Sequence, residues 1–310
     1  MSVSLFHGDC LELMQSIPDG SIDLILCDLP YGTMKGAGLD GWKNQTTEWD
    51  ERLDTNTLLQ QYERILRRNG TAILFSQEPY TSELRSHNAE NIEFAYPLIW
   101  KKDHFANALI SKKAPVSYFE DLSVFYKKYD SQLLNPLRMY FKKVMAYIGM
   151  ASIKDINKAL GHRRAEHAFY VDTMQFGLCT QDTYQELIDR FEIDRMDGFK
   201  TYMECEEIER TFKRTFNLPE GSRFIGNVLE FKKDYQRLHP TQKPVSLLEY
   251  LVKTYTNEGD TVLDNCMGSG STGVACVNTN RNFIGIELDK GYFDIAKERI
   301  EKANSTQTIR

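Results

Sequence analysis

Short apolar runs alternate with amphipathic segments through the first third of the chain. The apolar runs predict strands at Val3–His7, Ile22–Cys27, Thr71–Ser76, Ile92–Trp100 and Tyr118–Tyr126. The amphipathic segments between them predict helices at Cys10–Ser16, Leu53–Arg68 and Thr81–Asn88. Asn69-Gly70 is expected to end the second helix, and the glycine-rich stretch Gly32–Asn44 is expected to be a loop. Strands that alternate with helices indicate a parallel sheet.

The middle of the chain has a different pattern, which is helical almost throughout from about Leu134 to Asn217. Ser152-x-x-Asp155 is typical of a capping box at the start of a helix, and Gly161 separates that helix from a second one. Charge is polarised along this region, because residues 135–164 hold seven bases and one acid, whereas residues 165–209 hold three bases and twelve acids. The region therefore looks like a helical insertion, at 133–216, within a domain formed by residues 1–132 and 217–310.

The alternating pattern returns after the insertion. It predicts helices at Val245–Tyr255, Ser271–Val277 and Tyr292–Lys302, and strands at Thr261–Asp264 and Asn282–Glu287. We therefore expect an α/β fold with a doubly wound, mostly parallel sheet built from both ends of the chain.

Composition indicates an ordinary globular protein, with 41% hydrophobic and 26% charged residues among 310. No apolar run approaches the ~18 residues of a transmembrane helix, and the first ten residues lack the pattern of a secretory signal. The six cysteines are scattered, without a C-x-x-C pair, which disfavours disulfides and zinc and favours a cytoplasmic location.

The net charge of −6 disfavours a nucleic-acid partner only weakly, because binding depends on local patches. Between Ile99 and Lys143 there are nine basic residues and four acidic ones, with aromatic residues interleaved. Two interpretations stay open at this point. The segment forms amphipathic strands with solvated lysines, or it forms a surface that follows phosphates and offers rings for stacking.

Residues 261–287 read as a strand, a glycine-rich turn, a helix and a second strand. The turn contains Gly268-x-Gly270-x-x-Gly273, which matches the fingerprint of dinucleotide-binding proteins. Asp264-Asn265 at the tip of the first strand and Glu287 at the end of the second suit an adenosine without pyrophosphate, since a carboxylate there can accept hydrogen bonds from ribose hydroxyls.

A second unusual turn, Asp28-Leu29-Pro30-Tyr31, follows the predicted strand Ile22–Cys27 directly. It places a carboxylate, a fixed carbonyl and an aromatic ring at the carboxyl end of a strand, where α/β sheets bind ligands.

With these two turns in one chain, the sequence resembles the family of N6-adenine and N4-cytosine DNA methyltransferases, in the motif order called beta class. The family's D/N/S-P-P-Y/F/W tetrapeptide corresponds to Asp28–Tyr31, and its D-P-F-x-G-S-G-T-T loop corresponds to Asp264–Thr272. Further matches are Gly8-Asp9-Cys10, the complete stretch H-P-T-Q-K-P at 239–244, and Ile284–Glu287. The resemblance covers roughly residues 5–130 and 217–302.

The resemblance implies S-adenosylmethionine as cofactor and a seven-stranded type of methyltransferase sheet. The catalytic residues that it implies are Asp28, Leu29, Pro30 and Tyr31. The cofactor-binding residues that it implies are Asp9, Cys10, Thr241, Lys243, Asp264, Asn265, Cys266, Gly268, Ser269, Gly270, Ser271 and Glu287. The expected reaction is methyl transfer to the exocyclic amine of a flipped base, with adenine N6 favoured over cytosine N4 because the tetrapeptide begins with aspartate. No metal is expected.

Two departures from the family pattern stand out. Leu29 replaces the first proline, at a position that contributes its backbone carbonyl, and Asn265-Cys266 replaces proline-phenylalanine. The second change removes a ring expected beside the cofactor, so cofactor affinity is expected to be weak.

The partner that the resemblance implies is DNA, double-stranded or single-stranded. We expect the insertion to be the target-recognition module, with a purely structural or dimerising module as the alternative. The expected DNA contacts are Lys101, Lys102, Lys112, Lys113, Lys154, Lys158, Arg163 and Arg164. A homodimer and a cognate restriction endonuclease are further expectations.

Three rival functions remain at this stage. The chain could methylate RNA or a protein glutamine, it could be a nicotinamide oxidoreductase, or it could be a catalytically impaired DNA-binding protein in view of Leu29 and Asn265-Cys266.

Overall fold

The computed structural model of the chain describes residues 1–32, 52–87, 89–106, 111–128, 135–150, 152–212, 214–234 and 242–307. Contacts divide it into two compact units: a sheet unit, Met1–Lys127 with Thr215–Arg310, and a helical unit, Lys128–Arg214. The sequence placed the ends of the insertion at 133 and 216, whereas the contacts place them at 128 and 214. The recognition role of the helical unit stays a prediction.

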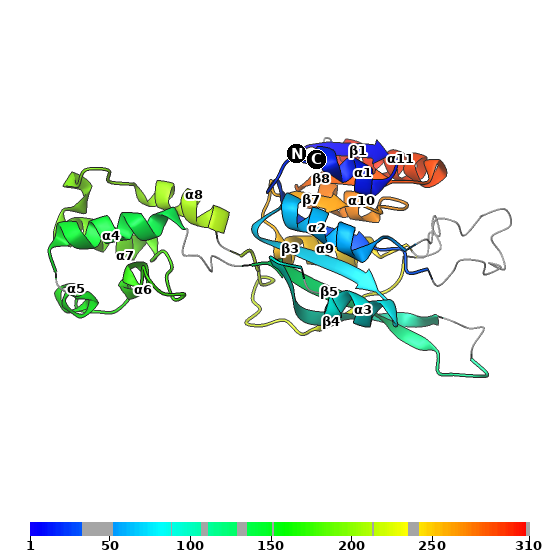
Figure 1. The fold of residues 1–310 in the computed structure, drawn as a ribbon, viewed down its shortest axis with the longest axis horizontal. Helices are drawn as coiled ribbons and strands as arrows, with labels where there is room; N and C mark the ends of the chain where they lie inside the picture. Colours follow the sequence, from blue (N-terminus) through cyan, green and yellow to red (C-terminus); the bar gives the residue numbers. More distant parts are fainter. Residues whose placement is uncertain are drawn as a thin grey trace. The chain divides into compact units, whose positions relative to one another are not determined.

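The described part of the sheet unit contains one sheet of eight strands, in the order β1-β8-β7-β2-β3-β5-β4-β6 (Figure 1). The strands are β1 (Val3–His7), β2 (Ile22–Asp28), β3 (Leu66–Ser76), β4 (Ile92–Ala106), β5 (Ser117–Lys127), β6 (Val228–Glu230), β7 (Thr261–Asp264) and β8 (Asn282–Glu287). Neighbours are parallel from β1 to β3, and β5 runs antiparallel to both β3 and β4. β6 pairs in parallel with β4 at the edge.

Helices cover both faces of this sheet (Figure 1). One face packs against α1 (Cys10–Leu13), α2 (Thr55–Ile65) and α3 (Tyr80–Ser86), and the other packs against α9 (Val245–Tyr255), α10 (Ser271–Asn278) and α11 (Lys290–Gln307). Alternate residues of β2 serve the two cores, because side chains along a strand point to opposite faces: Leu24 and Leu26 join one, Ile25 and Cys27 the other. The predicted doubly wound, mostly parallel α/β fold is confirmed.

The structure corrects two details of the predicted sheet. β3 begins at Leu66 rather than at Thr71, because Leu66 pairs with Ile22 before the register shifts. Asn69 does not cap a helix; it adopts a left-handed conformation, with φ 61°, within the irregular part of β3. The sheet also gains β6, whose three residues are too few to show a periodic pattern.

The helical unit contains α4 (Pro136–Ile148), α5 (Ile153–Leu160), α6 (Glu166–Phe169), α7 (Gln181–Phe191) and α8 (Tyr202–Phe212) around its own apolar core. The side chain of Ser152 caps α5 by accepting a hydrogen bond from the backbone N–H of Asp155, and Gly161 ends the helix with φ 80°. Both features follow from the sequence pattern. Among the residues described, no helix has the length and apolarity to cross a membrane.

Candidate active site

The carboxyl ends of three neighbouring parallel strands carry the candidate chemistry. β7 lies between β8 and β2, and the chain connects outwards in opposite directions from β7 and β2. This is the switch point at which doubly wound sheets bind ligands. It brings together Asp28 at the end of β2, Asp264 at the end of β7 and Glu287 at the end of β8.

Asp28 opens the predicted catalytic turn. Its Oδ1 accepts a hydrogen bond from the hydroxyl of Tyr31, and 21% of its side chain is exposed. Leu29 is buried in the core between the sheet and α2, which anchors the turn where the family has proline. The carbonyl of Tyr31 accepts a 2.8 Å hydrogen bond from Nε of Arg52. The turn is therefore held at several points, while part of the Asp28 side chain stays accessible.

Lys243 links Asp28 to a second carboxylate that the sequence did not single out. Its ammonium lies 2.5 Å from Oδ2 of Asp28 and 3.1 Å from Oε2 of Glu120 on β5. Lys102 on β4 pairs with Oε1 of Glu120. We call these four residues, Asp28, Lys243, Glu120 and Lys102, the charge ladder.

The charges of the ladder affect one another strongly. Burial raises the pKa of Asp28, and the ammonium of Lys243 only partly opposes that rise. Burial alone would raise the pKa of Glu120, but Lys243 and Lys102 together hold it below its usual value. The pKa of Lys243 is raised, because the two carboxylates outweigh the cost of burying its charge. Lys243 therefore stays protonated.

The glycine-rich turn after β7 has the backbone that the fingerprint predicts. Gly268 and Gly270 have φ values of 51° and 78°, which favour glycine. A Cβ at Gly270 would lie 2.9 Å from that of Ala296, and one at Gly273 would lie 2.3 Å from Cδ1 of Ile300. The turn thus allows α10 to pack closely on α11.

Polar side chains fix the strand end before this turn. Oδ2 of Asp264 accepts a 2.6 Å hydrogen bond from Thr272, and burial raises the pKa of Asp264 to about 7. The amide oxygen of Asn265 accepts a 2.6 Å hydrogen bond from Tyr62, and its Nδ2 lies 3.6 Å from Sγ of Cys10. Asn265 therefore ties the turn to α1 and α2.

Cys266 occupies the position of the family's aromatic residue. Its Sγ lies 3.5 Å from Nδ2 of Asn265, and its side chain is only half-buried. Ser269, two residues beyond Met267, accepts hydrogen bonds through its carbonyl and hydroxyl from Arg299, and Ser271 begins α10.

Glu287 and Asp9 lie at adjacent strand ends, because β1 pairs with β8 and the N–H of Gly8 donates to the carbonyl of Glu287. The carboxylate of Glu287 is buried and accepts hydrogen bonds of 2.8 Å from the backbone N–H groups of Gly268 and Asp289. Burial raises its pKa. The carboxylate of Asp9 is exposed and caps α1.

This arrangement fits an adenosine-containing cofactor. The glycines at 268 and 270 carry no side chains that would keep a ligand from the backbone, and Glu287 retains acceptor capacity beyond its two backbone hydrogen bonds. Asp9 adds an exposed acceptor beside it.

Comparison with known proteins identifies the family. A family model described as DNA methylase, named for N6 and N4 methyltransferases, matches residues 22–298. The chain belongs to the DNA methylase family. The predicted family, the S-adenosylmethionine cofactor and the DNA methyltransferase function are thereby confirmed.

Individual relatives agree with this membership. The chain is similar to the DNA adenine methyltransferase YhdJ of Escherichia coli (strain K12), with 25% identity over 97% of this chain and 83% of that protein. It is also similar to the Type II methyltransferase M2.DpnII of Streptococcus pneumoniae, with 50% identity over 83 residues, which span 27% of this chain and 31% of the relative. The crystal structure of the M1.HpyAVI–SAM complex shares the fold, with a TM-score of 0.54 at 21% identity over 96% of this chain and 99% of that chain.

Not every predicted site residue of the DNA methylase lies where the sequence suggested. Thr241, residues 33–44 of the expected loop and the first half of the H-P-T-Q-K-P stretch, residues 239–241, lie outside the described residues. Lys102 was expected to contact DNA, but only 2% of its side chain is exposed and it pairs with Glu120. Burial thus removes Lys102 from the surface, whereas Lys101, the preceding residue of β4, is exposed and pairs with Glu230.

The other predicted DNA contacts are exposed. Lys112 and Lys113 precede β5, and Lys154 and Lys158 lie on α5. Arg163 and Arg164 form ion pairs of 2.8 Å and 2.7 Å with Glu166 and Glu186.

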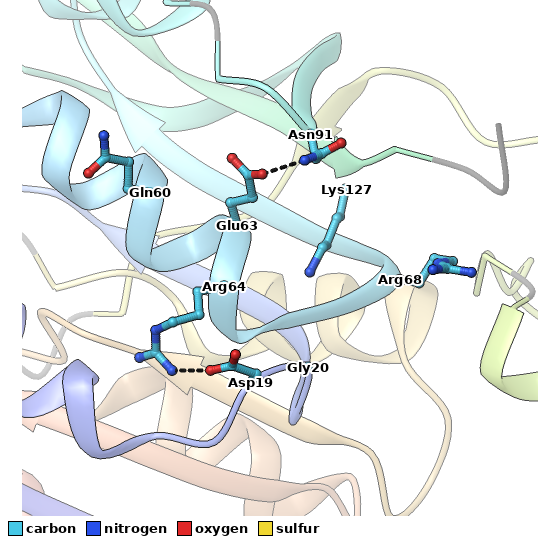
Figure 2. A pocket seen from close by; sticks show the side chains of 8 residues that line it. All are labelled: Asp19, Gly20, Gln60, Glu63, Arg64, Arg68, Asn91 and Lys127. Carbon is cyan, nitrogen blue, oxygen red and sulfur yellow. Dashed lines mark hydrogen bonds and ion pairs between the residues drawn. The ribbon is translucent and has the colours of Figure 1, made fainter. Parts of the chain in front are cut away.

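A hollow lies at the opposite end of the sheet, before β2 (Figure 2). It is open, about 640 Å³ in volume, and lined by charged groups that pair with one another. Arg64 binds Asp19 at 2.6 Å, and Asn91 binds Glu63 (Figure 2). The catalytic turn lies at the other end of β2, so this hollow is separate from the candidate active site.

Proposed function

We propose that this DNA methylase transfers a methyl group from S-adenosylmethionine to N6 of an adenine in double-stranded DNA. The observation that carries the proposal is the position of the Asp28–Tyr31 turn, at the carboxyl end of β2, beside the glycine-rich turn of β7. The two turns put an acceptor for the target amine next to the place for the methyl donor.

Asp28 and the carbonyl of Leu29 act on the target amine. The nitrogen of an exocyclic amine is a poor nucleophile because its lone pair is delocalised into the base. Two acceptors for its N–H groups favour the pyramidal nitrogen as the transition state forms. The cofactor supplies an electrophilic methyl group on sulfonium, and the protein contributes by holding the amine in line with it.

Tyr31 has two proposed roles. Its ring offers a face for stacking once the base has left the duplex, since a base cannot reach this site while it is paired. In the present structure its hydroxyl donates to Asp28, and burial raises the pKa of Tyr31 well above its usual value. Tyr31 therefore remains a neutral donor that steadies the carboxylate.

The proposed cofactor site uses the two neighbouring strand ends. Glu287 accepts hydrogen bonds from the ribose hydroxyls, as its buried position and remaining acceptor capacity allow. Asp9 and Cys10 approach the adenine of the cofactor. Residues Asp264 to Ser271 form the turn that faces the rest of the cofactor.

DNA is proposed to lie along the β4–β5 hairpin of the sheet unit. Lys101, Lys112 and Lys113 are exposed there, and the rings of Phe105 and Tyr118 lie 6.0 Å apart across the two strands. Cations beside aromatic rings suit phosphates and unstacked bases.

The helical unit is proposed to recognise the target sequence. Lys154 and Arg163 line a shallow hollow of about 360 Å³ together with Glu166 and Tyr170. Exposed cations beside a hollow can reach phosphates or base edges. A cytoplasmic location, a cognate restriction endonuclease and a homodimer remain proposals, of which the second is supported by the relative M2.DpnII being named a Type II methyltransferase.

Adenine is favoured over cytosine because the tetrapeptide begins with aspartate and because YhdJ is named a DNA adenine methyltransferase. The test is to incubate the protein with labelled S-adenosylmethionine and duplex DNA, RNA or protein, and to identify the methylated nucleoside. Labelled N6-methyladenine from DNA supports the proposal. N4-methylcytosine would overturn the choice of base, and no transfer to any DNA would favour a catalytically impaired DNA-binding protein.

A further inference from the structure

The charge ladder is balanced, and its members behind Asp28 are more enclosed than Asp28 itself. Two carboxylates alternate with two ammonium groups, and 21% of the Asp28 side chain is exposed, against 6% at Lys243, 10% at Glu120 and 2% at Lys102. The most exposed member of the ladder is thus Asp28, whose carboxylate is the proposed acceptor for the target amine.

Three segments that are distant in the sequence build the ladder: the end of β2, the β4–β5 hairpin and the residues just before α9. Asp121 pairs with Ser76 near the carboxyl end of β3, so Glu120 lies just beyond that end. The ammonium of Lys243 lies 5.1 Å from the ring centre of Phe75, and that of Lys102 lies 5.2 Å from the ring centre of Trp100. These rings support the two lysines in place.

Both oxygens of Asp28 already have donors in this structure. Oδ1 accepts from the hydroxyl of Tyr31 and Oδ2 from Lys243, so a target amine that binds Asp28 competes with these two donors for the acceptor capacity of the carboxylate. Oε2 of Glu120 lies 3.1 Å from the same ammonium and has no hydrogen bond of good geometry in the described part of the chain. Lys243 therefore has a second acceptor within reach.

We propose that Glu120, held in place by Lys102, takes over the ammonium of Lys243 when the target amine binds Asp28. The proposal rests on the proposed role of Asp28. Glu120 and Lys102 are then positioning residues, because they act on the amine only through Lys243 and Asp28.

Electrostatics gives the exchange a measurable signature. Asp28 must be ionised to accept the amine, and burial together with the charge of Glu120 raises its pKa, while Lys243 opposes the rise. Removing the charge of Glu120 should therefore lower the pKa of Asp28. Removing the charge of Lys102 leaves the carboxylate of Glu120 with Lys243 as its remaining cation, so Lys243 is drawn away from Asp28. The pKa of Asp28 should then rise.

Neither substitution replaces any other titratable group near the ladder. Those that face Asp28 or Glu120, besides the ladder itself, are Cys27, Tyr31, Lys233 and Asp264. If the acid limb of the pH profile moves in opposite directions in the two variants, the movement therefore reports the charges of the ladder.

The test compares Glu120→Gln and Lys102→Met by kcat and by the pH dependence of kcat/KM on duplex DNA, whose acid limb reports the free protein. In Glu120→Gln, kcat should fall on the order of tenfold, the size of one charge-assisted hydrogen bond, since Lys243 has nowhere to move. Its acid limb should shift down by about one pH unit, and that of Lys102→Met should shift up by a similar amount. The matched control is Glu230→Gln, since Glu230 pairs with exposed Lys101, the strand neighbour of Lys102, and should leave kcat and the acid limb unchanged.

The affinity for S-adenosylmethionine, measured by calorimetry, should be unchanged in both ladder variants. Acid limbs that stay in place, or that move in the same direction, would overturn the proposal even if kcat falls. If a single variant does not fold, the neutral double variant Glu120→Gln with Lys102→Met decides, because it leaves Asp28 and Lys243 balanced. Its kcat should be reduced with the acid limb near the normal position, and a normal kcat would overturn the proposal. A wild-type protein that methylates no DNA refutes the proposed function instead.

Discussion

Charged residues are paired differently in the charge ladder of the sheet unit and on the surface of the helical unit. In the sheet unit, Asp28, Lys243 and Glu120 form linked pairs with little solvent exposure. In the helical unit, cations and acids meet at the surface, as in the pair Arg163–Glu166, where 76% of the arginine side chain is exposed.

Buried ion pairs suit a catalytic site that needs fixed geometry, and exposed ion pairs suit a binding surface that must change partners. Breaking one member of a buried pair leaves an uncompensated charge and costs several kcal/mol. An exposed pair contributes about 0–1 kcal/mol and exchanges its partners readily. A phosphate can therefore replace Glu166 as the partner of Arg163 at little cost, whereas a charge of the ladder can leave one partner only for another within the ladder.

The largest effect is expected from Asp28→Ala in the sheet unit. It removes the acceptor for the target amine, so kcat should fall by about a hundredfold or more, while the affinity for S-adenosylmethionine changes little. The matched control is Asp19→Ala, which removes an ion-paired carboxylate at the other end of the sheet. Steady-state kinetics on duplex DNA measures both. Near-normal turnover in Asp28→Ala would remove Asp28 from the mechanism.

An intermediate effect is expected from Glu287→Ala. Loss of hydrogen bonds to a charged acceptor should weaken binding of S-adenosylmethionine by roughly 1.5–3 kcal/mol. Calorimetry measures this directly, with Glu249→Ala as control, because Glu249 is an exposed acceptor for Asn278 on α9 and α10. Unchanged affinity would mean that the end of β8 is not the ribose site.

The smallest effect is expected in the helical unit, from Arg163→Ala with Arg164→Ala. DNA affinity and methylation of the target site should fall, with cofactor binding unchanged. If the arginines contact phosphates only, the salt slope of binding should shrink by about one for each lost contact. If they read bases, discrimination should relax by roughly 1–3 kcal/mol at one position.

The control for the helical unit is Arg195→Ala with Arg210→Ala, which removes two other exposed ion pairs of that unit. A variant lacking Arg163 and Arg164 that methylates the same sites at the same rate and salt dependence would exclude this stretch from recognition.

The sequence predicted those features that depend on local pattern. The apolar run Ile22–Cys27 gave β2, and the turn that follows it placed Asp28 at the carboxyl end of a parallel strand. The glycine-rich turn and Glu287 were predicted in the same way, because strand ends and tight turns leave local signals.

The charge ladder left no such signal. Lys101 and Lys102 are neighbours on one strand, so they point to opposite sides, but which of them faces inwards depends on the pairing of β4 with β5. Glu120 gains its role only because that pairing brings it beside Lys102, while Lys243 arrives from a distant part of the chain. Contacts of this kind depend on tertiary structure.

The most direct test of the central claim is single-turnover transfer of a labelled methyl group from bound S-adenosylmethionine to duplex DNA. The wild-type protein should place the label on the exocyclic amine of adenine. Asp28→Ala should bind the cofactor with near-normal affinity and transfer the label about a hundredfold more slowly or worse. Label on a ring carbon, or equal rates in the two proteins, would contradict the account.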